Sequence, residues 1–328
     1  MNTNRKLSIN QRIRIMLSNF IRSQIFGILL ILFTMVFALS IFTKTFLTST
    51  NIFNILRAFS WIAISAFGQC LVIITGGIDL SVGSVMAFSG LISAILMKAG
   101  VYMPLAVLLG LTAGTLVGFL NGIMITKGKL PPFIATLGSL LMFRGLCYGI
   151  SGGWPVRDFP ESFSFFGQYD IPFLGIPIPL IFVILFTIIV GIFLSKTIWG
   201  YRIYAVGGNE TAASLSGINT GKVKIMVYTL SAFLASVGGI IMTSRLGVAA
   251  PTAANGYELD VIAATVVGGT SLTGGEGNII GVLVGALIMQ VLRTGLVLVG
   301  VSAYWLQAIQ GLVIVVAIML DQLRKQRK

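Results

Sequence analysis

Histidine is absent from this sequence of 328 residues, and charged residues make up only 9% of it. Without His the chain lacks the commonest general base and metal ligand of enzymes. Soluble domains carry about 25% charged residues, and a soluble fold of this size supplies only one or two cores for apolar side chains. The scarcity of charge therefore favours a membrane protein, and the missing His argues against an enzyme.

Cysteine is nearly as scarce, with two residues, Cys70 and Cys147, both inside apolar runs. We interpret them as small core residues, so the sequence predicts no disulfide, no redox function and no metal site.

Apolar residues are abundant, at 56% of the chain, and they come in long runs. A bilayer core of about 30 Å needs about 20 apolar residues per helix. Backbone in lipid must satisfy its own hydrogen bonds, and alternating strands are absent, so we predict an all-α, polytopic membrane bundle. Ten spans are expected: 25–42, 52–75, 78–97, 103–126, 132–151, 176–195, 225–245, 257–269, 277–299 and 302–321. The eighth is too short to cross alone unless its flanks contribute.

The net charge is +13, which in a soluble protein would suggest nucleic acid. Here the basic residues flank apolar runs, as they do at cytoplasmic membrane ends, so no nucleic-acid partner is expected. We predict a basic cytoplasmic segment at 1–24, a single transmembrane domain at 25–321 and a basic cytoplasmic tail at 322–328. With ten spans both termini are cytoplasmic, the loop 196–224 is cytoplasmic, and the acidic loop 152–175 lies outside.

One eight-residue pattern occurs twice. Residues 76–83 read GGIDLSVG and residues 268–275 read GGTSLTGG, which share the template G-G-x-[DS]-L-[ST]-x-G. Each copy follows one apolar run and precedes another, and internal repeats whose helices break at Gly are common in transporters. Coincidence in a Gly-rich chain is the alternative. Counting spans places both copies on the cytoplasmic side.

Polar and ionisable residues inside apolar runs mark polar pathways or internal ion pairs. If these residues are structural and do not line a pathway, Arg144 pairs with Asp79 or Asp260. Asp79 could also belong to a capped helix start beside Ser81. Residues 258 and 260, two apart on a helix, point in different directions and form no catalytic pair. The candidates for a translocation pathway are Asp79, Ser81, Thr136, Ser139, Arg144, Glu258 and Asp260.

A nucleotide site of the chain's own is not expected. The nearest phosphate-loop pattern, SGINTGKV at 216–223, has Ser where the first Gly belongs and Val where Ser or Thr would hold magnesium. If the chain transports a solute, the energy for transport must then come from a partner protein. In the segment 200–224, Asn209 is placed to cap a short helix that stops at Gly217, and such a helix between cytoplasmic turns suits docking.

The same residues carry a family resemblance. The chain resembles the permease subunits of bacterial ABC-type monosaccharide importers, the ribose type in particular, within the branched-chain amino-acid/ribose permease superfamily. The resemblance covers nearly the whole chain and rests on several motifs in the same order: residues 75–84, 132–138 followed by 144–145, 207–219, 256–260 and 268–272.

The resemblance implies a ten-helix permease of the cobalamin-uptake type, paired with a second copy, or with a related chain, around a central path in the inner membrane. It implies a cassette ATPase that binds ATP and Mg²⁺, no cofactor on this chain, and a periplasmic sugar-binding protein. Transport would be of a monosaccharide, ribose-type first, by alternating access. The coupling residues that it implies are Gly207, Gly208, Asn209, Glu210, Ala213, Leu215, Ser216 and Gly217.

Two alternatives remain open at this point. Branched-chain amino-acid permeases share the architecture, although the motif at 76–83 fits the sugar group better. An ion-coupled secondary transporter should have paired carboxylates near the membrane midplane, whereas Asp79, Glu258 and Asp260 lie near predicted span ends.

Overall fold

The computed structural model describes residues 24–172 and 175–302, followed by positions 305, 306, 308, 309, 311–313, 315, 316 and 319. The predicted basic tail 322–328, the predicted basic segment 1–24 apart from its last residue, and part of the tenth expected span lie outside these residues. The regular elements are α2 (Gln24–Phe42), α3 (Ser49–Ile74), α4 (Val82–Lys98), α5 (Met103–Thr126), α6 (Pro132–Ser151), η1 (Glu161–Phe166), α7 (Ile178–Lys196), α8 (Ile198–Gly208), α9 (Glu210–Leu215), α10 (Thr220–Leu246), α11 (Tyr257–Val267) and α12 (Ile279–Leu298).

Every regular element within the described ranges is helical, which confirms the all-α prediction. Seven of these helices are long and apolar enough to cross a membrane: α2, α3, α5, α6, α7, α10 and α12. Helix α4 has 17 residues and α11 only 11. By length and composition, the described residues therefore do not reach the ten spans that the sequence predicts.

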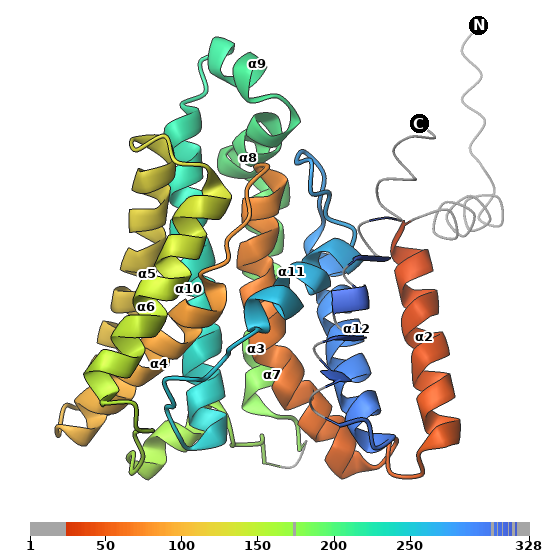
Figure 1. The fold of residues 1–328 in the computed structure, drawn as a ribbon. Helices are drawn as coiled ribbons and strands as arrows, with labels where there is room; N and C mark the ends of the chain where they lie inside the picture. Colours follow the sequence, from red (N-terminus) through yellow and green to blue (C-terminus); the bar gives the residue numbers. More distant parts are fainter. Residues whose placement is uncertain are drawn as a thin grey trace, which may run out of the picture.

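Two short helices explain two of the three missing spans, and the tenth lies partly outside the described residues. The third expected span was to start at residue 78, but residues 75–81 are not helical and α4 begins at 82. The eighth was to cover 257–269, and the 11-residue α11 follows a largely non-helical segment at 247–256. In Figure 1 both α4 and α11 begin within the bundle and not at one of its ends.

Small residues allow the central helices to pack closely. Helix α3 lies between α10, α12, α11 and α7, and all its residues from 59 to 74 are buried. A Cβ built on Gly68 would lie 2.7 Å from the Cα of Ser231 on α10, so only glycine fits that crossing. Gly118 on α5 similarly touches the carbonyl of Tyr228. Close backbone approach through Gly is how helices associate in lipid.

The bundle has two distinct ends (Figure 1). At one end lie α8 and α9, together with the loop that follows α11. At the opposite end lie the turn between α2 and α3 and the yellow-green connection that contains η1. We call these the α9 end and the outer-loop end.

Candidate functional site

The short helix α9 forms the tip of the α9 end (Figure 1). Asn209 caps it, because its side-chain oxygen accepts a hydrogen bond from Ala212 N at 2.9 Å. At the other terminus Gly217 has φ +83°, and the N–H groups of Gly217 and Ile218 donate to the carbonyls of Ser214 and Ala213, at 3.0 Å each. This is a Schellman stop. The predicted cap, helix and stop are confirmed.

One charged contact and one exposed apolar side chain define the surface of α9. Glu210 pairs with Lys224 of α10 at 2.7 Å and ties the start of α9 to the bundle. Ala213 is buried beneath the helix, whereas Leu215 is 86% exposed. Leu215 is therefore an apolar side chain that the described part of the chain leaves uncovered.

A polar cavity of about 390 Å³ lies at the base of α9. Tyr228 is one of its lining residues, and the hydroxyl of this side chain is buried without a hydrogen-bond partner within the described part of the chain. The lining residues are Thr75, Gly76, Gly77, Pro132, Val206, Gly207, Gly208, Asn209, Glu210, Lys224 and Tyr228. The coupling residues predicted at 207–210 therefore share one cavity with the first copy of the repeat.

A buried polar network surrounds Asp79. Its Oδ1 accepts hydrogen bonds from the N–H and the hydroxyl of Ser81, at 2.9 and 2.6 Å, and its Oδ2 accepts one from Ser231 of α10 at 3.0 Å. Asn121 of α5 donates to the Ser81 hydroxyl at 3.0 Å and accepts from Ser139 of α6. All five residues are at most 2% exposed. The network thus joins the non-helical segment 75–81, which we call the break before α4, to three helices.

The structure corrects the two structural alternatives proposed for Asp79. It forms no ion pair with Arg144, because serine donors satisfy its carboxylate. It also does not cap α4: the N-cap position is Ser81, which makes no side-chain cap hydrogen bond. Asp79 instead closes a turn two residues ahead, onto the N–H of Ser81.

Thr136 is fully buried and donates to the carbonyl of Ile78 at 3.1 Å. This bond links the N-terminal part of α6 to the same non-helical segment. Four of the predicted pathway residues, Asp79, Ser81, Thr136 and Ser139, therefore lie in one buried cluster.

The first turns of α4 and α11 meet inside the bundle. The Oε2 of Glu258 lies against Gly83, where a Cβ would also come within 2.6 Å of the carbonyl of Ala254. Both helices point their N-terminal, partly positive ends towards this region. The carboxylates lie near helix ends, as the sequence indicated, but these helix ends are inside the bundle.

Asp260 and Arg144 have partners other than those considered from the sequence. Asp260 accepts from Arg293 of α12 at 3.0 Å, and the Arg293 guanidinium also lies over the ring of Tyr257, 4.7 Å from its centre. Arg144 donates to the carbonyls of Pro251 and Ala253, at 2.7 Å each. The proposed Arg144–Asp260 ion pair is therefore wrong. Arg144 satisfies backbone carbonyls that the non-helical segment leaves free.

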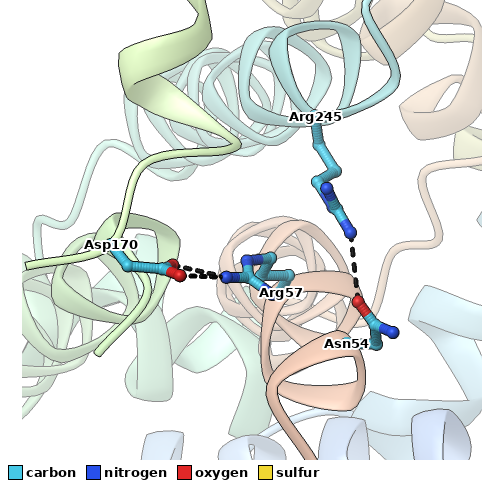
Figure 2. A network of polar contacts seen from close by, with 4 residues as sticks. All are labelled: Asn54, Arg57, Asp170 and Arg245. Carbon is cyan, nitrogen blue, oxygen red and sulfur yellow. Dashed lines mark hydrogen bonds and ion pairs between the residues drawn. The ribbon is translucent and has the colours of Figure 1, made fainter. Parts of the chain in front are cut away.

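The outer-loop end is held by a separate set of polar contacts. Figure 2 shows Arg57 of α3 paired with Asp170 of the outer loop at 2.5 Å, and Arg245 of α10 donating to Asn54 at 3.1 Å. Gln168 adds a bond to the carbonyl of residue 244 at 3.0 Å. The loop is thus attached to both central helices.

Sequence reasoning missed several of these partners. Asn121 could have been recognised in the sequence as a buried polar residue, because it is a lone amide within an otherwise apolar span. Ser231 could not, because it is one of many small residues in α10. Arg293 was visible as a charge within a span, whereas its pairing with Asp260 joins positions 33 residues apart. Among the described residues no group of three or more His, Cys, Asp or Glu side chains is arranged to hold a metal ion.

The chain is similar in sequence to known transport permeases. Residues 51–318 match the family model described as branched-chain amino acid transport system / permease component. The ribose import permease protein RbsC of Bacillus subtilis (strain 168) is 46% identical over 293 residues, which cover 89% of this chain and 90% of the relative. RbsC of Escherichia coli (strain K12) is 44% identical, covering 89% and 92%. The D-allose transport system permease protein AlsC of the same organism is 37% identical, covering 87% of each chain.

No solved structure matches. The family match spans most of the chain and its helical core, and the description is that of a transport subunit and not of an enzyme. The chain is a multi-pass membrane protein that belongs to the family of branched-chain amino acid transport system permease components.

Proposed function

We propose that this chain is the permease subunit of an ATP-binding-cassette importer that carries a monosaccharide, ribose-type pentoses first, across the bacterial inner membrane. The observation that carries the proposal is identity of 46% and 44% to two ribose import permeases over nine-tenths of their length. Relatives named for D-allose and xylose support the wider sugar class. The family description names branched-chain amino acids, which makes them the second candidate.

The proposed topology has ten crossings and both termini in the cytoplasm, as in the cobalamin-uptake permeases. The non-helical segments 75–81 and 247–256 extend α4 and α11 to full crossings, and the tenth expected span, 302–321, lies partly outside the described residues. Charge supports the orientation, because the α9 end carries Lys127 and Lys129 in a connection, together with Lys196 at the end of α7, Arg202 in α8, and Lys222 and Lys224 at the start of α10, whereas the outer loop is acidic.

The proposed energy source is a cassette ATPase that docks on α9 and itself binds ATP and Mg²⁺. Leu215 supplies the apolar contact, and the caps at Asn209 and Gly217 keep the helix rigid enough to transmit force. Glu210 and Lys224 fix its direction against α10. This chain needs no cofactor of its own in such a scheme.

The proposed path follows the meeting point of α4 and α11, at the contact with a second copy of the permease. Half-buried Arg144 and Glu258 line it, and the buried residues Asp79, Ser81 and Asp260 hold the two helix starts in place, with Thr136 and Ser139 supporting them. Discontinuous helices with N-termini near a central site are a recurrent transporter design. Alternating access then requires the two helix starts to separate and close.

A periplasmic sugar-binding protein is proposed to dock on the outer loop, residues 152–175. Its exposed aromatic residues, Trp154, Phe165 and Tyr169, offer contact area, and the contacts of Asp170 and Gln168 hold the loop in one conformation.

Reconstitution tests the proposal. The permease, its cassette ATPase and its binding protein are placed in liposomes, and ATP hydrolysis is measured with ribose, allose, xylose, leucine and isoleucine. Stimulation by a pentose and not by the amino acids is expected. Stimulation by leucine alone would transfer the assignment to the second candidate.

A further inference from the structure

Three segments far apart in sequence meet at the α9 end. They are the end of α8 at Gly207, the end of α3 at Ile74, and the second copy of the repeat at Gly274 and Gly275. The N–H of Gly275 donates to the carbonyl of Ile74 at 2.9 Å, so the second copy is bonded to the end of α3, two residues before the first copy. We call these four residues the glycine junction.

Gly207 lies between the other two segments. A Cβ built on it would clash with the carbonyl oxygen of Ile74 and lie 2.6 Å from the amide nitrogen of Gly275. From the opposite side, a Cβ on Gly274 would lie 2.8 Å from the carbonyl of Gly207. The neighbours are backbone atoms, which cannot rotate away as a side chain can. The three segments are therefore in direct backbone contact.

A second contact, one helical turn earlier, fixes the direction of α8. The hydroxyl of Tyr204 donates to the carbonyl of Gly277 at 2.7 Å. Burial raises the pKa of Tyr204 to about 12, so the hydroxyl stays protonated at neutral pH. Residues 204 and 207 lie on one face of the helix, and this face is attached to the loop between α11 and α12 at two points.

The connection from α8 to α9 leaves little room for independent movement. Asn209 alone separates the helices: its N–H donates to Ala205 at 3.1 Å, and its side chain caps α9. A displacement of α9 therefore reaches Gly207 through a continuous hydrogen-bonded backbone.

We propose that Gly207 is the positioning residue through which movement of α9 reaches both helix breaks at once. This inference rests on the proposed function. The break at 75–81 leads into α4, and the loop at 268–278 leads back to α11. The other ends of these two routes meet where Gly83 touches Glu258. The junction thus links the docking helix to the two helices whose starts face each other in the bundle.

Gly207→Ala tests the junction, and Gly191→Ala in α7 is its matched control. A Cβ on Gly191 has no heavy atom within 4 Å, and this residue lies outside α8, α9 and the junction. The readout is the number of ribose molecules taken up per ATP hydrolysed in the full reconstituted importer, alongside co-purification of the ATPase. Gly207→Ala should retain the ATPase, because α9 is unchanged. Its coupling ratio should fall several-fold, because the added methyl group separates segments that are in direct backbone contact. Gly191→Ala should match the parent protein.

Tyr204→Phe is the second variant, since it adds no atoms and removes only the hydroxyl that bonds to Gly277. It should lower the coupling ratio with unchanged yield, and it decides the matter if Gly207→Ala does not accumulate in the membrane. The junction proposal would be wrong if the parent protein transports ribose and the coupling ratio is normal in Tyr204→Phe and in any Gly207→Ala protein obtained. The proposed function would then remain intact. A parent importer that ribose does not stimulate would instead contradict the proposed function itself.

Discussion

Gly83, in the first turn of α4, lies against the Oε2 of Glu258, in the first turn of α11. No side chain larger than hydrogen fits at position 83 without moving this carboxylate or the carbonyl of Ala254. The two shortened helices therefore face each other start to start, and the spacing between them depends on one glycine.

Gly83→Ala should destabilise the protein and reduce transport, because the added methyl group pushes the starts of α4 and α11 apart. The expected loss is about 1–3 kcal/mol in the free energy of unfolding, typical of an overpacked core. Thermal unfolding in detergent measures it. Gly191→Ala in α7, whose Cβ would meet no atom within 4 Å, is the control and should be neutral or slightly stabilising. Equal stability of the two variants would contradict the contact.

Replacing Asp79 should separate its charge from its role as a hydrogen-bond acceptor. Asp79→Ala leaves the donors of Ser81 and Ser231 without a partner, at about 1–3 kcal/mol for each buried group. Asp79→Asn retains an acceptor oxygen for Ser81 and should cost less. Chemical unfolding of the two purified variants gives the comparison. If alanine were tolerated as well as asparagine, the network would not stabilise the break before α4.

Leu215→Asp should weaken binding of the cassette ATPase and leave the permease as stable as before, because the side chain is 86% exposed and supports no packing. A buried charge at an interface is unfavourable unless it is paired. Affinity measured with the purified ATPase tests this, with exposed Ser214→Ala on the same helix as control. Unchanged affinity for Leu215→Asp would place the docking contact elsewhere.

Glu210→Lys and Gly217→Pro should each abolish transport without preventing membrane insertion. The first replaces the attraction to Lys224 by repulsion, and the second removes the N–H that donates to Ser214 and forbids the positive φ of the helix stop. Ribose uptake by cells and the amount of permease in the membrane are measured together. Normal uptake in both variants would refute the assignment of α9.

Asp170→Ala should loosen the outer loop, because it removes the partner of Arg57 (Figure 2). Amide hydrogen exchange should speed up around residues 156–170 while the core helices keep their protection. Glu161→Gln, in the same loop but outside the ion pairs of the described residues, is the control. Equal exchange in both variants would mean that the ion pair does not fix the loop.

Local patterns in the sequence predicted the α9 region well. A cap, a short helix and a glycine stop depend on neighbouring residues, so Asn209 and Gly217 could be interpreted without the fold. The Gly residues of the two repeat copies suggested helix breaks there, but a Gly pair alone does not decide a break, because Gly238 and Gly239 lie inside α10.

Partners across the bundle could not be predicted in this way. Arg144 donates to two backbone carbonyls, and a backbone acceptor cannot be recognised from residue types. Asp79 meets Ser231 across 152 residues, and serines are too frequent in α10 for one to stand out. The late start of α4 was also hidden, because the apolar residues Ile78 and Leu80 precede the helix, whereas the shortness of the eighth span was visible in the sequence.

The most direct test of the account is ATP-dependent uptake of labelled ribose by liposomes that contain the permease, the cassette ATPase and the ribose-loaded binding protein. The account predicts uptake against a gradient that requires all three proteins and is lost in Glu210→Lys. Uptake that continues without ATP, or driven by an ion gradient alone, would contradict it.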